Sequence, residues 1–265
     1  MKVTSLHIYP VKSCRVVNLS LATITATGFE NDRRWMLVDE NDQFLSQRIS
    51  PKMALIQALV FTDRLNLKFG SQEINLPHYT EEHGQRTVTI FDSRCLVQDY
   101  GDEAADLLST YLEKKVRFVT MNKSFHRNIT SSKAMQKDIL SFADGFPFLL
   151  ATQSSLAELN GRLDVPVLMD RFRANIVIDG TEPFAEDHWK KIAIGDAVFF
   201  LPKACTRCPI TTVDQQSGER HRTEPLKTLA SFRMQERKVV FGMNLQHDHG
   251  SGYTIKVGDA VRIIA

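Results

Sequence analysis

Apolar and polar residues alternate along the chain up to about residue 100. The segment that contains Leu65, Leu67 and Phe69 shows this alternation, and clusters of turn-forming residues separate it from similar segments. A period of two places neighbouring side chains on opposite faces of a sheet. This half is therefore predicted to form antiparallel strands, with a hairpin turn at residues 39–42, where Asp and Asn tolerate turn geometry.

Apolar residues at a spacing of three and four occur in shorter segments. Residues 104–112 place Ala, Leu and Tyr side chains on one helical face, and residues 226–232 repeat the pattern over two turns. Both segments are predicted to be amphipathic helices. Ser155 and Glu158 form a capping box, which predicts a short helix that ends at residues 160–161.

The second half of the chain also predicts strands. Apolar runs occupy residues 146–152 and 174–178, and the segments 194–198 and 257–261 both place Gly-Asp between apolar residues. The Gly-Asp pairs favour tight hairpin turns at two matching corners of a closed β-structure. Residues 121–143 are polar and weakly patterned, so a domain boundary or a covering loop is expected there. The predicted fold class is mainly β with a few helices.

Composition narrows the classes of function. The chain has 265 residues with 33 Lys and Arg against 31 Asp and Glu, a balance that excludes a nucleic-acid partner without local clustering of charge. It has neither a secretory signal nor an apolar run that could span a membrane, so no membrane association and a cytoplasmic location are expected. Four cysteines in a chain of this size predict reduced thiols.

The densest candidate chemistry lies in residues 204–214, a loop bracketed by two prolines. Cys205 and Cys208 flank Arg207 there. A nearby cation favours a thiolate, which suits either nucleophilic chemistry or ligation of a soft metal.

Three alternatives stay open for this loop. The cysteines could be small apolar residues at a barrel rim, since free Cys is among the most buried residue types. They could form a zinc half-site completed by His247 and His249, although a His-x-His pair departs from the usual ligand spacing. They could also form a thioredoxin-like redox pair, which requires a βαβ setting that the pattern does not show.

Two further clusters could bind anions. Lys12 and Ser13 follow the first strand in a turn whose backbone N–H groups, hydroxyl and ammonium could hold a phosphate. Arginines in 32–35 and 170–175 are predicted to enter apolar strands, where alternation turns at least one inward in each. An inward Arg needs an anion, and Asp32 and Asp170 are the simplest ion-pair partners, for Arg34 and Arg171 among others.

Together these motifs resemble the MOSC family, in the branch that carries a preceding MOSC N-terminal β-barrel domain. That branch includes the mitochondrial amidoxime-reducing components and bacterial reductases of N-hydroxylated bases. The residues that carry the resemblance are Tyr9-Pro10-Val11-Lys12-Ser13, Asp32-Arg33, residues 141–145, Phe172-Arg173 with Asn175, Cys205-Thr206-Arg207-Cys208 with residues 211–213, residues 224–226 and Val257-Gly258-Asp259. The resemblance implies two β-barrel-like units, a MOSC N-terminal domain over 1–120 and a MOSC domain over 121–265.

The resemblance also implies a molybdenum-cofactor site. Cys208 would ligate molybdenum and be the catalytic residue, and the pterin dithiolene would supply the other sulfur ligands. The residues implied to line the pterin and its phosphate are Lys12, Ser13, Arg33, Asp144, Gly145, Arg173, Asn175, Thr206 and Arg207. A pterin with a phosphate tail would be the anion that the inward arginines need. No zinc is expected.

The implied reaction is a two-electron reduction of an N–O bond in small substrates such as amidoximes, hydroxylamines and N-hydroxylated bases. The chain has no cysteine beyond Cys208, so no iron–sulfur cluster is expected, and a separate flavin, ferredoxin or cytochrome protein would donate electrons. Thr211, Thr212 and Asp214 could serve a proton route or be ordinary turn residues. Pro209 departs from the bulky apolar residue common in relatives. The alternative function is a cofactor-binding or sulfur-carrier protein without its own turnover, as in the MOSC domains of molybdenum-cofactor sulfurases.

Overall fold

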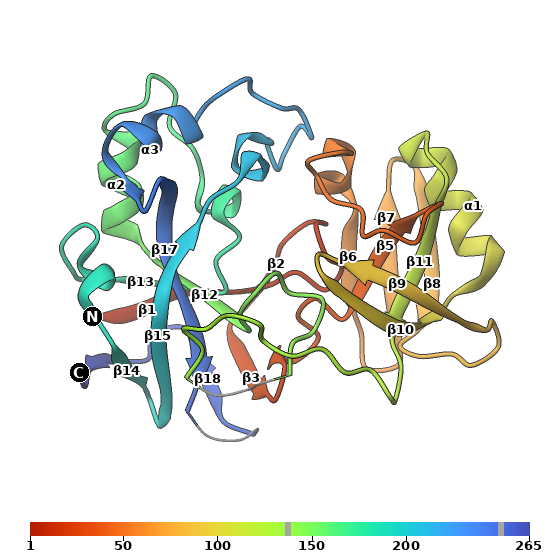
Figure 1. Cartoon of the computed structure of the whole chain (residues 1–265), viewed down its shortest axis with the longest axis horizontal. Helices are drawn as coiled ribbons and strands as arrows, with labels where there is room; N and C mark the ends of the chain where they lie inside the picture. Colours follow the sequence, from red (N-terminus) through yellow and green to blue (C-terminus); the bar gives the residue numbers. More distant parts are fainter. Residues whose placement is uncertain (136–138, 249–251) are drawn as a thin grey trace.

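The computed structural model describes residues 1–135, 139–248 and 252–265. Within these ranges the chain is mainly β, with α1 (Gly101–Leu112), α2 (Gln153–Asn160), α3 (Leu226–Phe232) and short 3-10 helices. Two β-rich regions lie side by side (Figure 1). The predicted fold class is confirmed, and all three predicted helices form.

The largest sheet combines strands from both ends of the chain. Its order is β19 (Val261–Ile263), β14 (Lys191–Ile194), β15 (Ala197–Thr206), β17 (Lys238–His247), β12 (Phe148–Thr152), β13 (Ile176–Asp179), β1 (Lys2–Ile8) and β2 (Val17–Leu19), with β16 (Met234–Gln235) attached to β17. The pairings are antiparallel except for β12 with β13, which α2 connects.

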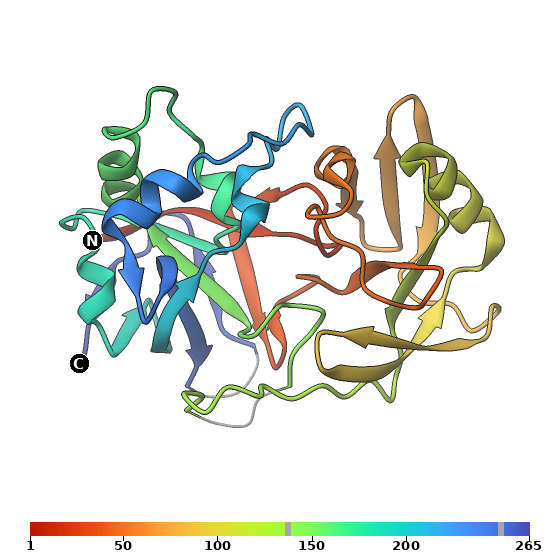
Figure 2. The same ribbon diagram turned by 45° about the horizontal axis from the view of Figure 1, so that its top comes forward.

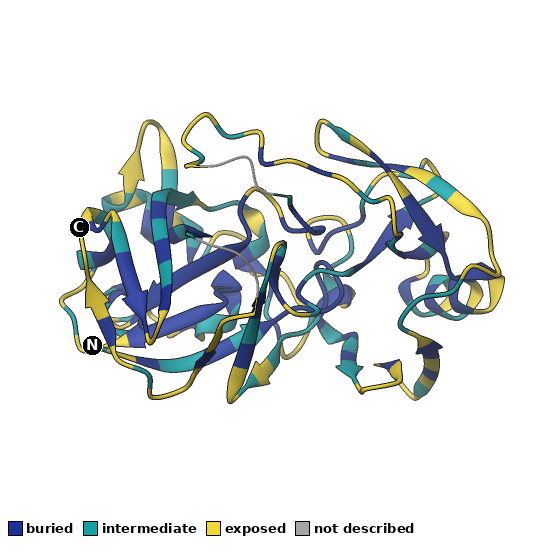
Figure 3. Ribbon diagram, turned by 90° about the horizontal axis from the view of Figure 1, so that it is seen from below, coloured by how far each residue is buried: buried dark blue, intermediate teal, exposed yellow. Residues whose placement is uncertain are grey.

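Hydrogen bonds between the chain ends close this sheet. Lys2 bridges Ala260, the Val3 N–H donates to the Asp259 carbonyl at 2.9 Å, and the Val261 N–H donates to the Met1 carbonyl at 3.0 Å. The closed sheet surrounds a core of alternating inward side chains that includes Leu6, and the strands carry long buried stretches in Figure 3. Burial of this apolar surface is the main force that holds the closed sheet together.

Smaller sheets form the other region. One consists of β5 (Trp35–Asp39), β11 (Val116–Met121), β10 (Ser93–Asp99) and β9 (Gln85–Ile90), and another of β6 (Gln57–Val60), β7 (Arg64–Phe69) and β8 (Gln72–Pro77). The predicted alternation over residues 65–69 is that of β7. Helix α1 buries Ala104, Leu108 and Leu112 against this region, as its helical spacing predicts. A further small sheet of β18 (Thr254–Lys256), β3 (Leu21–Thr25) and β4 (Gly28–Phe29) belongs to the first region, because its buried side chains join the core of the large sheet.

The helix cap and one predicted hairpin differ from expectation. The cap of α2 is Thr152, whose Oγ1 accepts from the Ser155 N–H at 3.1 Å, because β12 runs straight into the helix; the predicted capping box at Ser155 is wrong. Gly195, with φ of 55°, forms the predicted turn between β14 and β15. Gly258, with φ of 96°, also forms a turn, but β18 pairs with β3 and β19 with β14, so the second hairpin is wrong.

The segment between β11 and β12 crosses from one region to the other (Figures 1 and 2). Its described residues form neither a helix nor a strand of a sheet, in agreement with the polar stretch in the sequence. The division of the chain at residue 120 stays a prediction. Although β1 and β2 lie at the start of the sequence, they belong to the large sheet, whose other strands all come from residues after 147.

Candidate functional site

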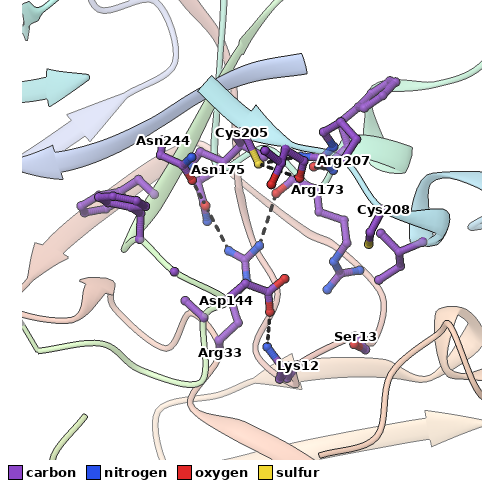
Figure 4. Close-up of a pocket in the computed structure, with 18 residues that line it drawn as sticks. Lys12, Ser13, Arg33, Asp144, Arg173, Asn175, Cys205, Arg207, Cys208 and Asn244 are labelled. Atoms are coloured by element: carbon purple, nitrogen blue, oxygen red, sulfur yellow. Dashed lines mark hydrogen bonds and ion pairs between the residues drawn. The ribbon is translucent and has the colours of Figure 1, made fainter. Parts of the chain in front are cut away.

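One pocket between the two regions contains every residue predicted for the cofactor site. Lys12 and Ser13 reach it from the loop between β1 and β2, Arg33 from the turn before β5, Asp144 and Gly145 from the segment before β12, Arg173 and Asn175 from the approach to β13, and Thr206, Arg207 and Cys208 from the end of β15 and the loop after it. Figure 4 shows the Cys208 sulfur and the charged ends of Arg33, Arg173 and Lys12 facing a common space. Residues far apart in sequence therefore lie together around residues 205–208, here called the Cys loop.

Three of these residues have left-handed backbone. Ser13, Arg33 and Arg173 have φ of 66°, 49° and 56°. Such angles strain a residue with a Cβ and persist only where the surroundings enforce them, often at functional sites. The expectation that the arginines lie inside strands is wrong, because each sits in a turn just before its strand. The strand predicted to begin at Ala174 begins instead at Ile176, the first residue of β13, because Arg173 is still part of the turn.

Arg33 is tied into a buried polar network. Its Nη1 donates to Asp32 Oδ2 at 2.5 Å and to Asn175 Oδ1 at 3.0 Å. Asp32 also accepts from the Tyr9 N–H at 2.8 Å. Asp32 is thus the predicted ion-pair partner, although of Arg33 and not of Arg34. Asn175 acts mainly as the bridge that fixes this network to β12, since its Oδ1 also accepts from the Leu149 N–H at 3.2 Å.

The other arginine cluster pairs differently. Arg171 Nη2 donates to Asp214 Oδ2 at 2.6 Å, so the predicted partner Asp170 is wrong. Asp170 instead accepts from the Gln216 side chain at 3.3 Å. The η2 turn (Met169–Phe172) carries Arg171 toward the segment after the Cys loop, where Asp214 lies.

Two guanidinium groups lie over the ring of Tyr9. The Cζ atoms of Arg33 and Arg173 are 4.4 and 4.0 Å from its ring centroid. Cation–π contacts of this kind are attractive, and more so when they are desolvated. The ring therefore fixes both cations at one wall of the pocket, and burial raises the pKa of the Tyr9 hydroxyl, which keeps it neutral.

Arg173 carries a charge that the protein leaves largely uncompensated. Burial, and then repulsion from Arg33, lower its pKa to about 10. Its Nη1 donates to the Cys14 carbonyl at 2.8 Å, whereas its buried Nη2 has no hydrogen-bond partner among the described residues, and neither does Nε of Arg207. Buried donors are normally satisfied. These two unsatisfied donors indicate that a ligand with hydrogen-bond acceptors binds in the pocket.

Lys12 differs because it has a counter-charge. Its ammonium forms an ion pair with Asp144 and donates to the Phe142 carbonyl at 2.7 Å. Burial lowers the pKa of Lys12. Attraction by Lys12, and then by Arg33 and Arg173, lowers the pKa of the Asp144 carboxyl to about 2. Asp144 sits at the pocket mouth with 77% of its side chain exposed. The uncompensated positive charge thus belongs to Arg173 and Arg207.

The two cysteines of the loop have different surroundings. Cys205 lies inside β15, which runs to Thr206, so the prediction that the loop begins at residue 204 is wrong. Its sulfur accepts from Arg207 Nη1 at 3.0 Å. Cys208 caps the η4 turn (Pro209–Thr212), and within the described part of the chain its sulfur has no hydrogen-bond donor. The cation that was predicted to favour a thiolate therefore contacts Cys205. The Cys208 sulfur lines the pocket with no such contact.

The residues considered for proton transfer have turn roles. Thr211 Oγ1 donates to the Cys208 carbonyl at 3.1 Å, and Thr212 Oγ1 donates to the Pro209 carbonyl at 2.7 Å. Asp214 pairs with Arg171 and accepts two backbone N–H groups. They stabilise the loop that presents Cys208, and none of the three lines the pocket.

The alternatives of zinc ligation and thioredoxin chemistry fit the geometry poorly. On β17, His247 lies opposite Phe199, whereas the Cys loop begins where Thr206 lies opposite Val240. His247 and Val240 are seven residues apart on β17, which places His247 roughly 20 Å from the start of the Cys loop. His249 lies outside the described residues, among which no group of three or more potential metal-ligating side chains occurs. The strand before the cysteines pairs antiparallel on both sides, unlike a βαβ unit.

Some lining residues were missed. Asn244, Phe146 and Ile210 also line the pocket. Asn244 interrupts the apolar run of β17 and donates weakly to carbonyls of β15 at 3.3 Å. A polar residue inside a buried strand was the available signal for Asn244. Nothing in the local pattern marks Phe146 or Ile210.

Comparison with known proteins defines the class. Residues 1–115 match the MOSC N-terminal beta barrel domain, and residues 137–262 match the MOSC domain. The chain therefore belongs to the MOSC family, in the branch with that N-terminal domain.

Among its relatives is mitochondrial amidoxime-reducing component 1 of Homo sapiens, 32% identical over 280 residues that cover 99% of this chain and 82% of the relative. The Xenopus laevis protein of the same name is 34% identical over 249 residues, which cover 89% of this chain and 73% of that relative. Molybdenum cofactor sulfurase of Danio rerio is 34% identical over 275 residues, 95% of this chain but only 32% of that relative. The names of these relatives thus refer to amidoxime reduction in two cases and to the molybdenum cofactor in the third. No helix in the described ranges is long and apolar enough to cross a bilayer.

Proposed function

We propose that this protein is a molybdenum-cofactor-dependent reductase of N-hydroxylated compounds, with Cys208 as the metal ligand. The observation that carries the proposal is the convergence of this thiol with the guanidinium groups of Arg173 and Arg207, whose buried Nη2 and Nε atoms, respectively, have no partner among the described residues. A soft sulfur ligand suits molybdenum, and unsatisfied guanidinium donors suit a phosphate. The pocket therefore fits a metal-bearing pterin with an anionic tail.

Each side chain has a distinct role in this proposal. Arg173 and Arg207 bind the anionic tail, with Lys12, Ser13 and Thr206 beside them. Arg33, held by Asp32 and Asn175, keeps Tyr9 and thus Arg173 in place. Asp144 and Gly145 form the mouth. When bound, the molybdenum–pterin group would supply two-electron reduction at the N–O bond, and the chain supplies ligation, charge and a protected pocket.

Whole-chain similarity favours a reductase over a sulfur carrier. The amidoxime-reducing components align over 82% of their length in the human protein, whereas the zebrafish sulfurase aligns over 32% of its length. A reductase also needs electrons, and we propose that a separate donor protein provides them to a cytoplasmic enzyme. The chain divides functionally into the N-terminal unit over 1–120 and the ligand-bearing unit over 121–265.

The test uses protein from a host that makes the cofactor. The loaded protein, given a chemical reductant and an N-hydroxylated base, is expected to consume the base, and Cys208→Ser to abolish consumption. Transfer of cofactor or sulfur to a client protein without any turnover would instead establish the carrier function.

A further inference from the structure

A second cavity opens directly from the cofactor pocket. The two share Lys12, Ser13, Asp144, Cys208 and Asn244. The outer cavity continues between the two regions of the molecule, and the additional residues that line it include Phe44, Arg48, Phe91, Asp92, Arg127, Lys203 and Lys238. A group bound at Cys208 could therefore extend outward along this cavity.

An aromatic pair forms one wall. The rings of Phe44 and Phe91 have centroids 4.7 Å apart and planes inclined by 52°. Phe91 is 42% exposed and stands in the two-residue turn between β9 and β10, with φ of 52°. Such turns strongly prefer Asn, Asp or Gly. Turn geometry does not account for a partly exposed Phe there, and the turn reaches toward the large sheet (Figures 1 and 2).

Positive charge lines the rest of the cavity. Arg48, Lys203 and Lys238 form no ion pair with any carboxylate of the described residues. The lining carboxylates are Asp92 and Asp144, and Asp144 is paired with Lys12. The wall thus has an excess of unpaired cations.

Arg127 adds a buried cation. It is 6% exposed, and its three hydrogen bonds go to backbone carbonyls of residues 141–144, so none goes to an acid. Its Nε has no partner within the described ranges. Burial lowers the pKa of this guanidinium, and a nearby anion would raise it again.

We propose that the outer cavity is a substrate subsite for a planar base that carries a phosphate monoester, with the base against Phe44 and Phe91 and the phosphate near Arg48, Lys203 and Lys238. Bases stack on aromatic side chains with useful affinity, and phosphates select clustered Arg and Lys. This inference rests on the proposed function and narrows its substrates to N-hydroxylated nucleotides in preference to free bases.

The kinetic test compares N-hydroxycytosine, its ribonucleoside and its 5′-monophosphate, with a chemical reductant in place of a donor protein. The monophosphate is expected to have a KM about 10-fold lower than the base. Arg48→Ala combined with Lys238→Ala should raise the KM for the monophosphate about 10-fold and change that for the base less than twofold. Phe91→Leu should raise KM for all three. Arg94→Ala with Lys227→Ala removes the same charge from exposed positions outside the cavity and should change nothing.

A binding measurement separates this inference from the proposed function. Titration of cofactor-free protein with cytidine 5′-monophosphate should show binding that the Arg48/Lys238 variant weakens about 10-fold. If no N-hydroxylated compound is reduced but this binding is found, the proposed function fails and the subsite stands. Equal KM values for base and monophosphate, or an effect of the variant only when a protein donor is used, would overturn the subsite.

Discussion

Arg173 and Arg33 both contact the ring of Tyr9, yet their replacement should have very different effects. Arg173 is buried with a pKa of about 10 in place of 12.5, a shift worth about 3 kcal/mol against the charged form. Because the folded-state pKa is lowered, this cost is fully present at pH 7 and is lost only as the pH rises from about 10 to 12.5. Arg173→Met removes the cost.

The same substitution loses a charged hydrogen bond to the Cys14 carbonyl, worth about 1.5–3 kcal/mol, and a cation–π contact worth about 1 kcal/mol. The terms nearly cancel, so the free energy of unfolding of cofactor-free Arg173→Met should lie within about 2 kcal/mol of the unsubstituted protein. Arg33→Met instead leaves the buried Asp32 carboxylate, 3% exposed, without its cation, which costs about 3–5 kcal/mol.

Denaturant unfolding followed by circular dichroism measures both values in the cofactor-free protein, and molybdenum analysis of the loaded protein measures function. Arg173→Met is expected to fold well and to lose the cofactor. A destabilisation of Arg173→Met equal to that of Arg33→Met, or unchanged cofactor content, would refute the idea that Arg173 is kept charged for a ligand.

Other substitutions test separate parts of the structure. Burial raises the pKa of Glu186, so its charged form lowers the stability of the folded protein above the folded-state pKa and not at low pH. Glu186→Gln should therefore raise the unfolding free energy at pH 8 and change it little near pH 4. Denaturant titrations at the two pH values measure this difference, and an equal effect at both would contradict the assignment. In β17, Gly242 has φ of 74°, and a Cβ there would lie 2.5 Å from the Leu150 carbonyl oxygen. Gly242→Ala should therefore lower the free energy of unfolding by roughly 3 kcal/mol. Gly145→Ala is the control because a Cβ there meets no atom within 4 Å, and a loss below about 1 kcal/mol in Gly242→Ala would refute the close approach. Asp144→Asn leaves Lys12 without its counter-charge and should tighten binding of inorganic phosphate to the cofactor-free pocket about 5-fold by calorimetry, whereas weaker binding would show that Asp144 supports the anion site.

Local pattern predicts much of the fold. Helices α1 and α3 follow from a periodicity of three to four and strands such as β7 from a periodicity of two, because burial of one face is a local property of the sequence. The closure of the large sheet depends on contacts between Lys2 and Ala260, at opposite ends of the chain, and no local pattern encodes such a pairing. The second Gly-Asp turn shows the same limit, since its flanking strands pair with different neighbours.

The resemblance predicted which residues lie together better than it predicted their geometry. The resemblance selected residues that the structure brings to one pocket, because shared motifs reflect a shared fold. The left-handed backbone of Arg33 and Arg173 and the pairing of Arg171 with Asp214 were not foreseen. Both depend on tertiary contacts, which override the alternation expected for a strand.

The bond between the Cys208 sulfur and molybdenum is the central claim, and X-ray absorption spectroscopy at the molybdenum edge tests it most directly. The loaded protein is expected to show one metal–sulfur contact more than Cys208→Ser, while Cys205→Ser keeps the full set because Cys205 already accepts from Arg207. An identical sulfur shell in the unsubstituted protein and in Cys208→Ser, or loss of the contact in Cys205→Ser alone, would contradict the assignment.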